Sequence, residues 1–158
     1  MLNLSINDIK NRKIWEDAGI KLPTFDYDKV AAATAENPEW VHFGAGNIFR
    51  GFIAVLQQKL LNEGKARTGI IAVETFDEEI IDKVYTPYDN LGLLVIMNLD
   101  GSLDKEVVAS ITEGLVGDPS RKDDWQYLQE VFANPLLKLA SFTITEKGYS
   151  LKNMQGEY

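Results

Sequence analysis

Residues 42–51 read His-Phe-Gly-Ala-Gly-Asn-Ile-Phe-Arg-Gly; the β-type residues before them begin at Trp40, and a stretch with helical spacing of apolar residues follows. A strand, a glycine turn and a helix in this order can bind the pyrophosphate of a dinucleotide. The main-chain N–H groups of the turn and the positive end of the helix both attract an anion. The sequence therefore predicts a nucleotide site at this turn.

Each glycine of the turn has its own predicted role. Gly44 permits the tight turn out of the strand, and Gly46 lets the main chain approach the pyrophosphate without an intervening Cβ. The third glycine of the usual GxGxxG pattern is replaced by Phe49. We therefore expect the helix to pack further from the sheet, or in a different register.

The residues after the turn fit a strand–helix–strand unit. Gly64 ends the predicted helix, and residues 69–73 form a continuous apolar run typical of a parallel strand covered on both faces. The next residue is Glu74, whose carboxylate is placed to accept hydrogen bonds from the adenosine ribose and to repel the 2′-phosphate of NADP. Asp77 is an alternative for this role, although it also fits the N-cap of the following helix. The predicted buried face of the first helix consists of Ile48, Phe49, Phe52, Ile53, Val55, Leu56, Leu60 and Leu61.

The composition is that of an ordinary globular domain. The 158 residues are 45% hydrophobic and 25% charged, with a formal net charge of -8. This charge disfavours nucleic acid and anionic membranes as partners. The absence of cysteine excludes disulfides, a thiolate nucleophile and a cysteine zinc site. Without an apolar span or a signal-peptide pattern, the expected location is cytoplasmic.

Alternating strands and helices predict an α/β fold: a Rossmann-like, mostly parallel doubly wound sheet with one β-hairpin. The carboxyl ends of the strands, where ligands bind in such sheets, are predicted at residues 44–47, 74–76 and 145–149. The expected helices cover residues 5–17, 28–36, 47–63 and 118–134, with another helix after Asp77. The expected strands cover residues 40–43, 69–73, 91–98, 105–111 and 139–145, and Asp100-Gly101 forms the hairpin turn.

A resemblance to a known family emerges from three segments. Residues 141–149 read Ser-Phe-Thr-Ile-Thr-Glu-Lys-Gly-Tyr, and they accompany the glycine turn and the Tyr-Asp-Asn-Leu-Gly-Leu-Leu-Val run at 88–95. Together they resemble the amino-terminal domain of the polyol-specific long-chain dehydrogenase/reductase family, over about residues 37–151. The family includes mannitol dehydrogenases, fructuronate (mannonate) reductases and tagaturonate (altronate) reductases. The resemblance implies an N-terminal helical extension over residues 1–36 and an incomplete NAD(P)-binding domain over residues 37–158, with the C-terminal substrate domain absent.

The resemblance also implies a set of cofactor-binding residues, with NAD as the expected cofactor. Glu74 would hold the ribose, and no metal ligand or catalytic residue is expected. The pyrophosphate side would comprise Gly44, Ala45, Gly46, Asn47, Ile48, Phe49 and Arg50, and the nicotinamide side Thr145, Glu146 and Lys147.

Alternatives stay open for several of these residues. Phe49 also fits a core position, and Arg50 also fits a solvated helix residue whose stem packs on Phe49 or Tyr88. Glu146 and Lys147 also fit a surface ion pair. For His42, the only histidine, we expect a packed, hydrogen-bonded side chain rather than an acid or base.

The implied activity is hydride transfer between a nicotinamide and a keto-sugar acid, fructuronate or tagaturonate, giving mannonate or altronate. The amino-acid sequences of residues 74–85 and 88–95 resemble the branch of the family that acts on these sugar acids more than the mannitol dehydrogenases. Mannitol and arabinitol remain alternative substrates. In the family, a lysine acid/base with asparagine and histidine partners belongs to the C-terminal domain, so the chain alone is expected to be inactive. Two other hypotheses are a non-catalytic nucleotide-binding module and an α/β domain that binds no nucleotide.

Overall fold

The computed structural model describes residues 2–144, 152 and 156–157. Its main sheet is parallel throughout, with the strand order β6-β3-β2-β7. The chain passes outward from β2 through β3 to β6, and then returns to the far side of β2 as β7. The strand order therefore reverses between β2 and β7, the place where ligands bind in doubly wound sheets. The strands are β2 (Trp40–Phe43), β3 (Ile70–Glu74), β6 (Ile111–Val116) and β7 (Leu139–Phe142).

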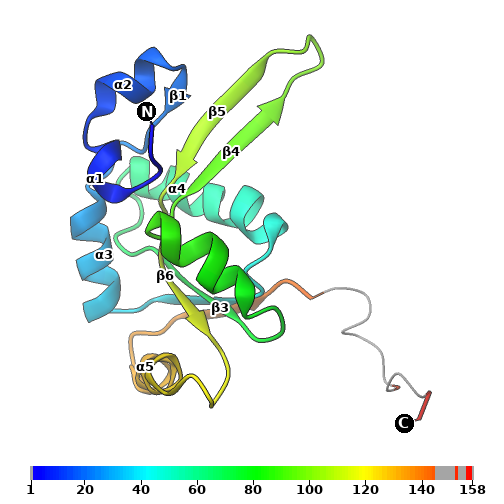
Figure 1. Cartoon of the computed structure of the whole chain (residues 1–158). Helices are drawn as coiled ribbons and strands as arrows, with labels where there is room; N and C mark the ends of the chain where they lie inside the picture. The colour runs from blue at the N-terminus through cyan, green and yellow to red at the C-terminus, as the bar shows by residue number, and fades with distance from the viewer. Residues whose placement is uncertain (1, 145–151, 153–155, 158) are drawn as a thin grey trace.

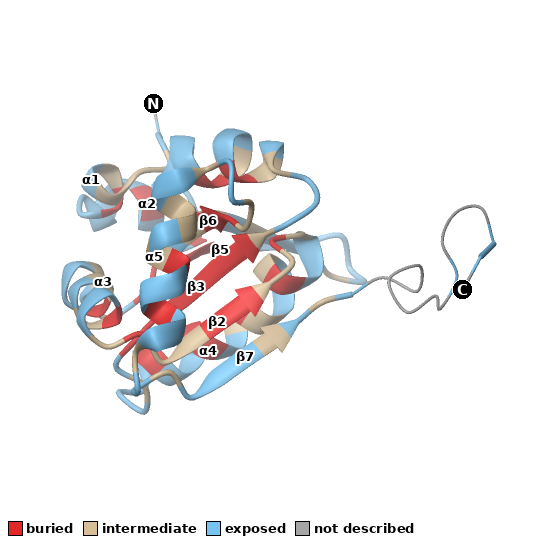
Figure 2. Ribbon diagram, turned by 90° about the horizontal axis from the view of Figure 1, so that it is seen from below, coloured by how far each residue is buried: buried red, intermediate tan, exposed pale blue. Residues whose placement is uncertain are grey.

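Helices cover both faces of this sheet, which confirms the predicted Rossmann-like α/β fold. On one face lie the π-helical turn η1 (Phe49–Ile53), its continuation α4 (Ala54–Asn62) and η2 (Ile81–Tyr85). On the other face α5 (Lys122–Ala133) packs across the buried strands (Figure 2). The central strand β3 is buried along Ile70–Val73, as its continuous apolar sequence predicts.

The π-helical turn η1 determines which side of the helix formed by η1 and α4 is buried. The buried residues are Phe49, Ala54, Gln57, Gln58 and Leu61, with a gap of five positions between the first two and gaps of three or four positions from Ala54 onward, to Gln57 or Gln58 and then to Leu61. A π turn inserts one extra residue and rotates the rest of the helix, so the predicted apolar face is only partly correct. Four members of that face are exposed: Ile48, Phe52, Leu56 and Leu60.

A hairpin interrupts the crossover from β3 to β6. It consists of β4 (Gly92–Met97) and β5 (Leu103–Val108), which extend away from the main sheet (Figure 1). The predicted turn is confirmed, since Gly101 has the positive φ of 82° that this tight connection requires. The short strand β1 (Ile20–Lys21) pairs with β5 in parallel, so the N-terminal segment contributes to a second sheet.

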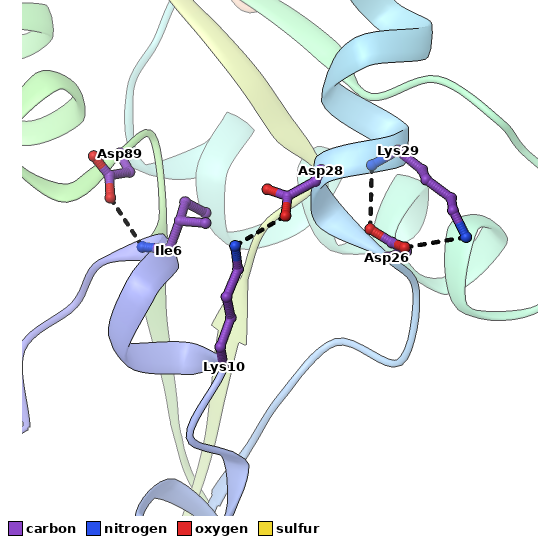
Figure 3. A network of polar contacts seen from close by, with 6 residues as sticks. All are labelled: Ile6, Lys10, Asp26, Asp28, Lys29 and Asp89. Atoms are coloured by element: carbon purple, nitrogen blue, oxygen red, sulfur yellow. Dashed lines mark hydrogen bonds and ion pairs between the residues drawn. The ribbon is translucent and has the colours of Figure 1, made fainter.

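The N-terminal segment contains α1 (Ile6–Ile9), α2 (Arg12–Asp17) and α3 (Tyr27–Glu36). A polar contact joins it to the rest of the chain, since the Ile6 N–H donates to Asp89 at 2.9 Å (Figure 3). Within the segment, Lys10 after α1 pairs with Asp28 of α3 at 2.9 Å. The short helix η3 (Thr86–Tyr88) precedes Asp89. The division of the chain after residue 36 stays a prediction.

Several predicted element boundaries are wrong, and the strand expected over residues 139–145 ends at Phe142. Residues 5–17 form two helices because the chain bends at Asn11, which lies outside helical φ/ψ. Residues 105–111 belong to two strands, since the chain leaves the hairpin after Val108 and enters the main sheet at Ile111. The helix expected at residue 118 begins at Lys122, because Asp118 instead accepts the Ser120 N–H in a preceding turn.

Within the described residues, no helix combines the length and hydropathy that crossing a bilayer requires.

Candidate functional site

Gly44 is required by the fold itself. Its φ is 102°, and a Cβ here would lie 2.5 Å from the side-chain oxygen and 2.8 Å from the main-chain oxygen of Thr143. Its N–H extends the sheet by donating to the Val73 carbonyl at 2.9 Å. The predicted tight turn therefore has two physical causes, the left-handed conformation and the close approach of β7.

Gly46 differs from Gly44 in both respects. Its φ is not positive, and a Cβ built on it would have no atom of the described residues within 4 Å. The first helical hydrogen bond runs from the Arg50 N–H to the Gly46 carbonyl at 3.1 Å. Among the described residues, none accepts a hydrogen bond from the N–H groups of Gly46, Asn47 or Ile48. The open space and unpaired donors at the start of a long helix are suited to an anion.

Glu74 connects the end of β3 to the turn. One oxygen of its carboxylate accepts the Ala45 N–H at 3.0 Å, and the other accepts the N–H groups of Thr75 at 2.9 Å and Phe76 at 3.0 Å. The second oxygen also accepts a long contact of 3.5 Å from the Asp77 N–H. The Ala45 N–H is thus already paired, whereas the next three N–H groups have no partner among the described residues. The oxygen that accepts Ala45 has no other donor in the described part of the chain, so Glu74 retains a lone pair for a further donor there.

Asp77 does not make the side-chain N-cap contact expected of it, and its alternative role at the ribose stays a prediction. Its side chain accepts no hydrogen bond from the described residues, and the short helix η2 that follows begins after Ile80. The predicted side-chain N-cap is therefore wrong. The Asp77 main-chain carbonyl accepts the Ile80 N–H at 3.1 Å instead.

Arg50 provides a positive charge beside the unpaired N–H groups. Its guanidinium donates to the Asn47 side chain and lies over the Tyr85 ring, with its central carbon 5.8 Å from the ring centroid. The ring beneath the guanidinium is thus Tyr85, and packing of the Arg50 stem on Phe49 or Tyr88 stays a prediction. Within the described part of the chain, Arg50 has no acidic partner, and its buried Nε has no hydrogen bond. The charge remains available to a ligand.

Phe49 and His42 lie between the helix and the sheet. Both are fully buried, and their rings are stacked with centroids 4.1 Å apart and an interplanar angle of 7°. The aromatic ring at the position of the usual third glycine is accommodated where the helix adopts its π turn. His42 is packed and hydrogen-bonded, as expected. Burial lowers its pKa to about 4, so the ring is neutral at pH 7.

Sequence reasoning missed two residues that hold the turn. The Tyr85 hydroxyl donates to the Ala45 carbonyl at 2.8 Å, and the Thr143 hydroxyl donates to the Gly44 carbonyl at 3.1 Å. Burial raises the pKa of Tyr85, which keeps its hydroxyl protonated as a donor. Both contacts span large separations in sequence, so no local pattern indicates them. The predicted nicotinamide-side residues Thr145, Glu146 and Lys147 lie outside the described residues.

An apolar cavity of about 390 Å³ lies on the α5 side of the sheet. Its walls include Phe43, Trp125 and Phe132, and Thr75 and Gly117 also line it, from the carboxyl ends of β3 and β6. Thr75 directly follows Glu74, so the cavity adjoins the residue expected to hold the ribose. Among the described residues, no group of three or more histidine or acidic side chains could hold a metal ion.

Comparisons with known proteins give related sequences and structures. The chain is 52% identical over 155 residues to the D-mannonate oxidoreductase of Thermotoga maritima, a match covering 98% of this chain and 29% of that protein. A D-sorbitol dehydrogenase crystal structure in substrate-free form superimposes with a TM-score of 0.70 and 26% identity, covering 88% of this chain and 27% of the other. Pseudomonas fluorescens mannitol 2-dehydrogenase, in a ternary complex with NAD and D-mannitol, gives a TM-score of 0.69 and 25% identity, with coverage of 89% and 27%.

The chain thus spans under a third of the length of these relatives. No family model matches the sequence. The extensive identity to a mannonate enzyme agrees with the two structural neighbours, both polyol dehydrogenases, and with the resemblance seen in the sequence. These similarities confirm the resemblance to the amino-terminal domain of the polyol-specific long-chain dehydrogenase/reductase family.

Proposed function

We propose that the chain binds NAD and forms the nucleotide-binding part of an oxidoreductase that interconverts a keto-sugar acid and its alcohol. The carrying observation is the open helix start at Gly46–Ile48. Within the described part of the chain, its three N–H groups have no hydrogen-bond acceptor, and the neighbouring Arg50 has no acidic partner. A pyrophosphate fits both features, because it brings negative charge and acceptor oxygens.

The other parts of NAD have proposed positions around this turn. The ribose would lie at Glu74, whose negative charge disfavours the 2′-phosphate of NADP. The adenine would lie against the apolar cavity beside Thr75, whose aromatic walls suit a flat base. Thr145, Glu146 and Lys147 would lie toward the nicotinamide, which supplies hydride-transfer chemistry when NAD is bound.

The proposed substrates are fructuronate or tagaturonate and the alcohols mannonate or altronate. The 52% identity to a D-mannonate oxidoreductase supports this choice over mannitol or arabinitol. The structural neighbours, which are named for D-sorbitol and mannitol, stand at only 26% and 25% identity. His42 is engaged at both ring nitrogens, so we assign it no proton transfer. We therefore propose that this chain alone binds NAD without turning over substrate.

The test is a titration of the 158-residue chain with NADH, followed by quenching of Trp40 and the other tryptophans. We expect saturable quenching, weaker binding of NADPH, and at least a roughly tenfold loss of affinity in Gly46→Val, or about 1.4 kcal/mol. Gly51→Ala is the matched control. It lies in the same helix, and its Cβ would make only an ordinary 3.7 Å contact with Leu94.

Two results would overturn the proposal. The first is an absence of quenching by the wild-type chain at roughly millimolar NADH, the weakest affinity compatible with a cofactor site. The second is equal binding by the wild-type chain and Gly46→Val, which would place any nucleotide away from the turn.

A further inference from the structure

A partly buried chain of four side chains links β7 to the glycine turn. Trp40 Nε1 lies 2.7 Å from Ser141 Oγ, and Ser141 Oγ lies 2.8 Å from His42 Nδ1. On the other side of the ring, His42 Nε2 lies 3.2 Å from Thr143 Oγ1, which lies 3.1 Å from the Gly44 carbonyl oxygen. Trp40 and His42 are alternate residues of β2, and Ser141 and Thr143 are alternate residues in and just after the neighbouring β7. The four side chains therefore lie on one face of the sheet.

The two ends of this chain fix the direction of every hydrogen bond. The indole N–H of Trp40 can only donate, and the Gly44 carbonyl can only accept. The single hydroxyl hydrogen of Thr143 is therefore used on Gly44, so Thr143 must accept from His42, whose Nε2 carries the hydrogen. Nδ1 is then an acceptor for the Ser141 hydroxyl. One arrangement, with His42 neutral and protonated at Nε2, gives every donor an acceptor.

We propose that His42 and Thr143 are positioning residues for the dinucleotide site, because their hydrogen bonds hold the Gly44 carbonyl and so orient the open N–H groups that follow. This inference rests on the proposed function. Gly44 needs such support, since a glycine at a φ of 102° has no side chain to restrict it. A turn held in its binding geometry before the ligand arrives loses less entropy on binding.

The contacts divide the turn into a held part and an open part. Thr143 holds the Gly44 carbonyl, while Tyr85 and Glu74 hold the carbonyl and the N–H of Ala45. From Gly46 to Ile48, the N–H groups have no partner among the described residues. The fold therefore fixes the two residues before the open amides and leaves those amides unpaired.

Thr143→Val tests the inference, because valine keeps the shape of threonine and removes both hydrogen bonds. We expect a roughly tenfold weaker affinity for NADH, about 1.4 kcal/mol. Thr143→Ser keeps the hydroxyl and is the matched control, with an expected affinity within about threefold of wild type. Urea unfolding of all three proteins verifies that each is folded at the titration temperature.

A second readout needs no variant. His42 is the only histidine, so the ¹⁵N spectrum of the imidazoles reports on this ring alone. We expect Nε2 to resonate as a protonated, pyrrole-type nitrogen and Nδ1 as an unprotonated, pyridine-type nitrogen at pH 7. In Thr143→Val, we expect the two tautomers to become mixed.

The outcomes separate this inference from the proposed function. A wild-type chain that binds no NADH overturns both. A wild-type chain that binds NADH, with equal affinity in Thr143→Val, overturns only the positioning role. A hydrogen on Nδ1 in the wild type contradicts the derived chain of hydrogen bonds, even if the valine variant does not fold.

Discussion

Acidification should destabilise this fold through His42. In the folded state, burial lowers its pKa to about 4, whereas an exposed histidine in the unfolded chain has a pKa of 6.5. Between these two values the unfolded state binds more protons, so the free energy of unfolding falls as the pH is lowered. The loss begins near pH 6.5 and is complete near pH 4. A difference of about 2.5 pKa units corresponds to about 3 kcal/mol at 1.36 kcal/mol per unit.

Urea unfolding at pH steps from about 7 to 4 measures this loss. Other groups titrate nearby, including Glu113, whose pKa is raised by burial and by Asp124 and which therefore acts in the opposite direction. His42→Gln is the control, since glutamine is uncharged at every pH and leaves those groups in place. The difference between the two proteins isolates the histidine. Parallel stability curves for wild type and His42→Gln would refute the reasoning.

Three further predictions concern single residues. Gly44→Ala should lower the free energy of unfolding by about 3 kcal/mol or more, because the backbone is strained there and the new Cβ would lie 2.8 Å from a main-chain oxygen. Gly46→Ala should leave the free energy of unfolding unchanged or raise it by up to about 1 kcal/mol. Equal losses in the two variants would contradict the division of the turn. Gln58→Met should cost about 2–5 kcal/mol in urea unfolding, because buried main-chain groups that Gln58 bonds at 2.9 Å and 2.7 Å lose their partner; a near-neutral result would be inconsistent with this bridge. Asp82→Asn should leave the thermal midpoint unchanged at moderate salt, since its exposed pair with Arg121 is screened; a clear drop would show that the pair stabilises the fold.

The parts of the fold that the sequence predicts are those set by local chemistry. The strand at Trp40–Phe43, the glycine turn and the apolar run ending at Glu74 each depend on neighbouring residues, and all three are present. The hairpin turn at Gly101 belongs to the same class, because its positive φ is a property of one residue. Such signals depend little on the rest of the chain.

Features set by tertiary context could not be predicted in this way. The spacing of Ile48, Phe52, Leu56 and Leu60 suits a buried face only if the helix has a uniform period, and the π turn over Phe49–Ile53 removes that uniformity. Likewise, an uninterrupted β-type sequence gives no sign that the chain changes sheets between β5 and β6.

The candidate site shows the same division. The open amides beyond Gly46 follow from the glycine pattern, but the groups that hold the preceding residues come from distant positions. Tyr85 is 40 residues away from Ala45, and Thr143 is 99 residues away from Gly44. Glu74 was expected to bind ribose, yet its visible role is to pair main-chain N–H groups. Hydrogen bonds of this kind become visible only when the strands are placed side by side.

The central claim is that a pyrophosphate binds to the N–H groups of Gly46–Ile48, which have no partner among the described residues, at the start of the helix formed by η1 and α4. Backbone amide shifts of the ¹⁵N-labelled 158-residue chain, recorded during a titration with NADH, test it residue by residue. We predict that the largest saturable shifts occur at Gly46, Asn47 and Ile48. Saturable shifts confined to another region, or no shifts at these three amides, would contradict the claim.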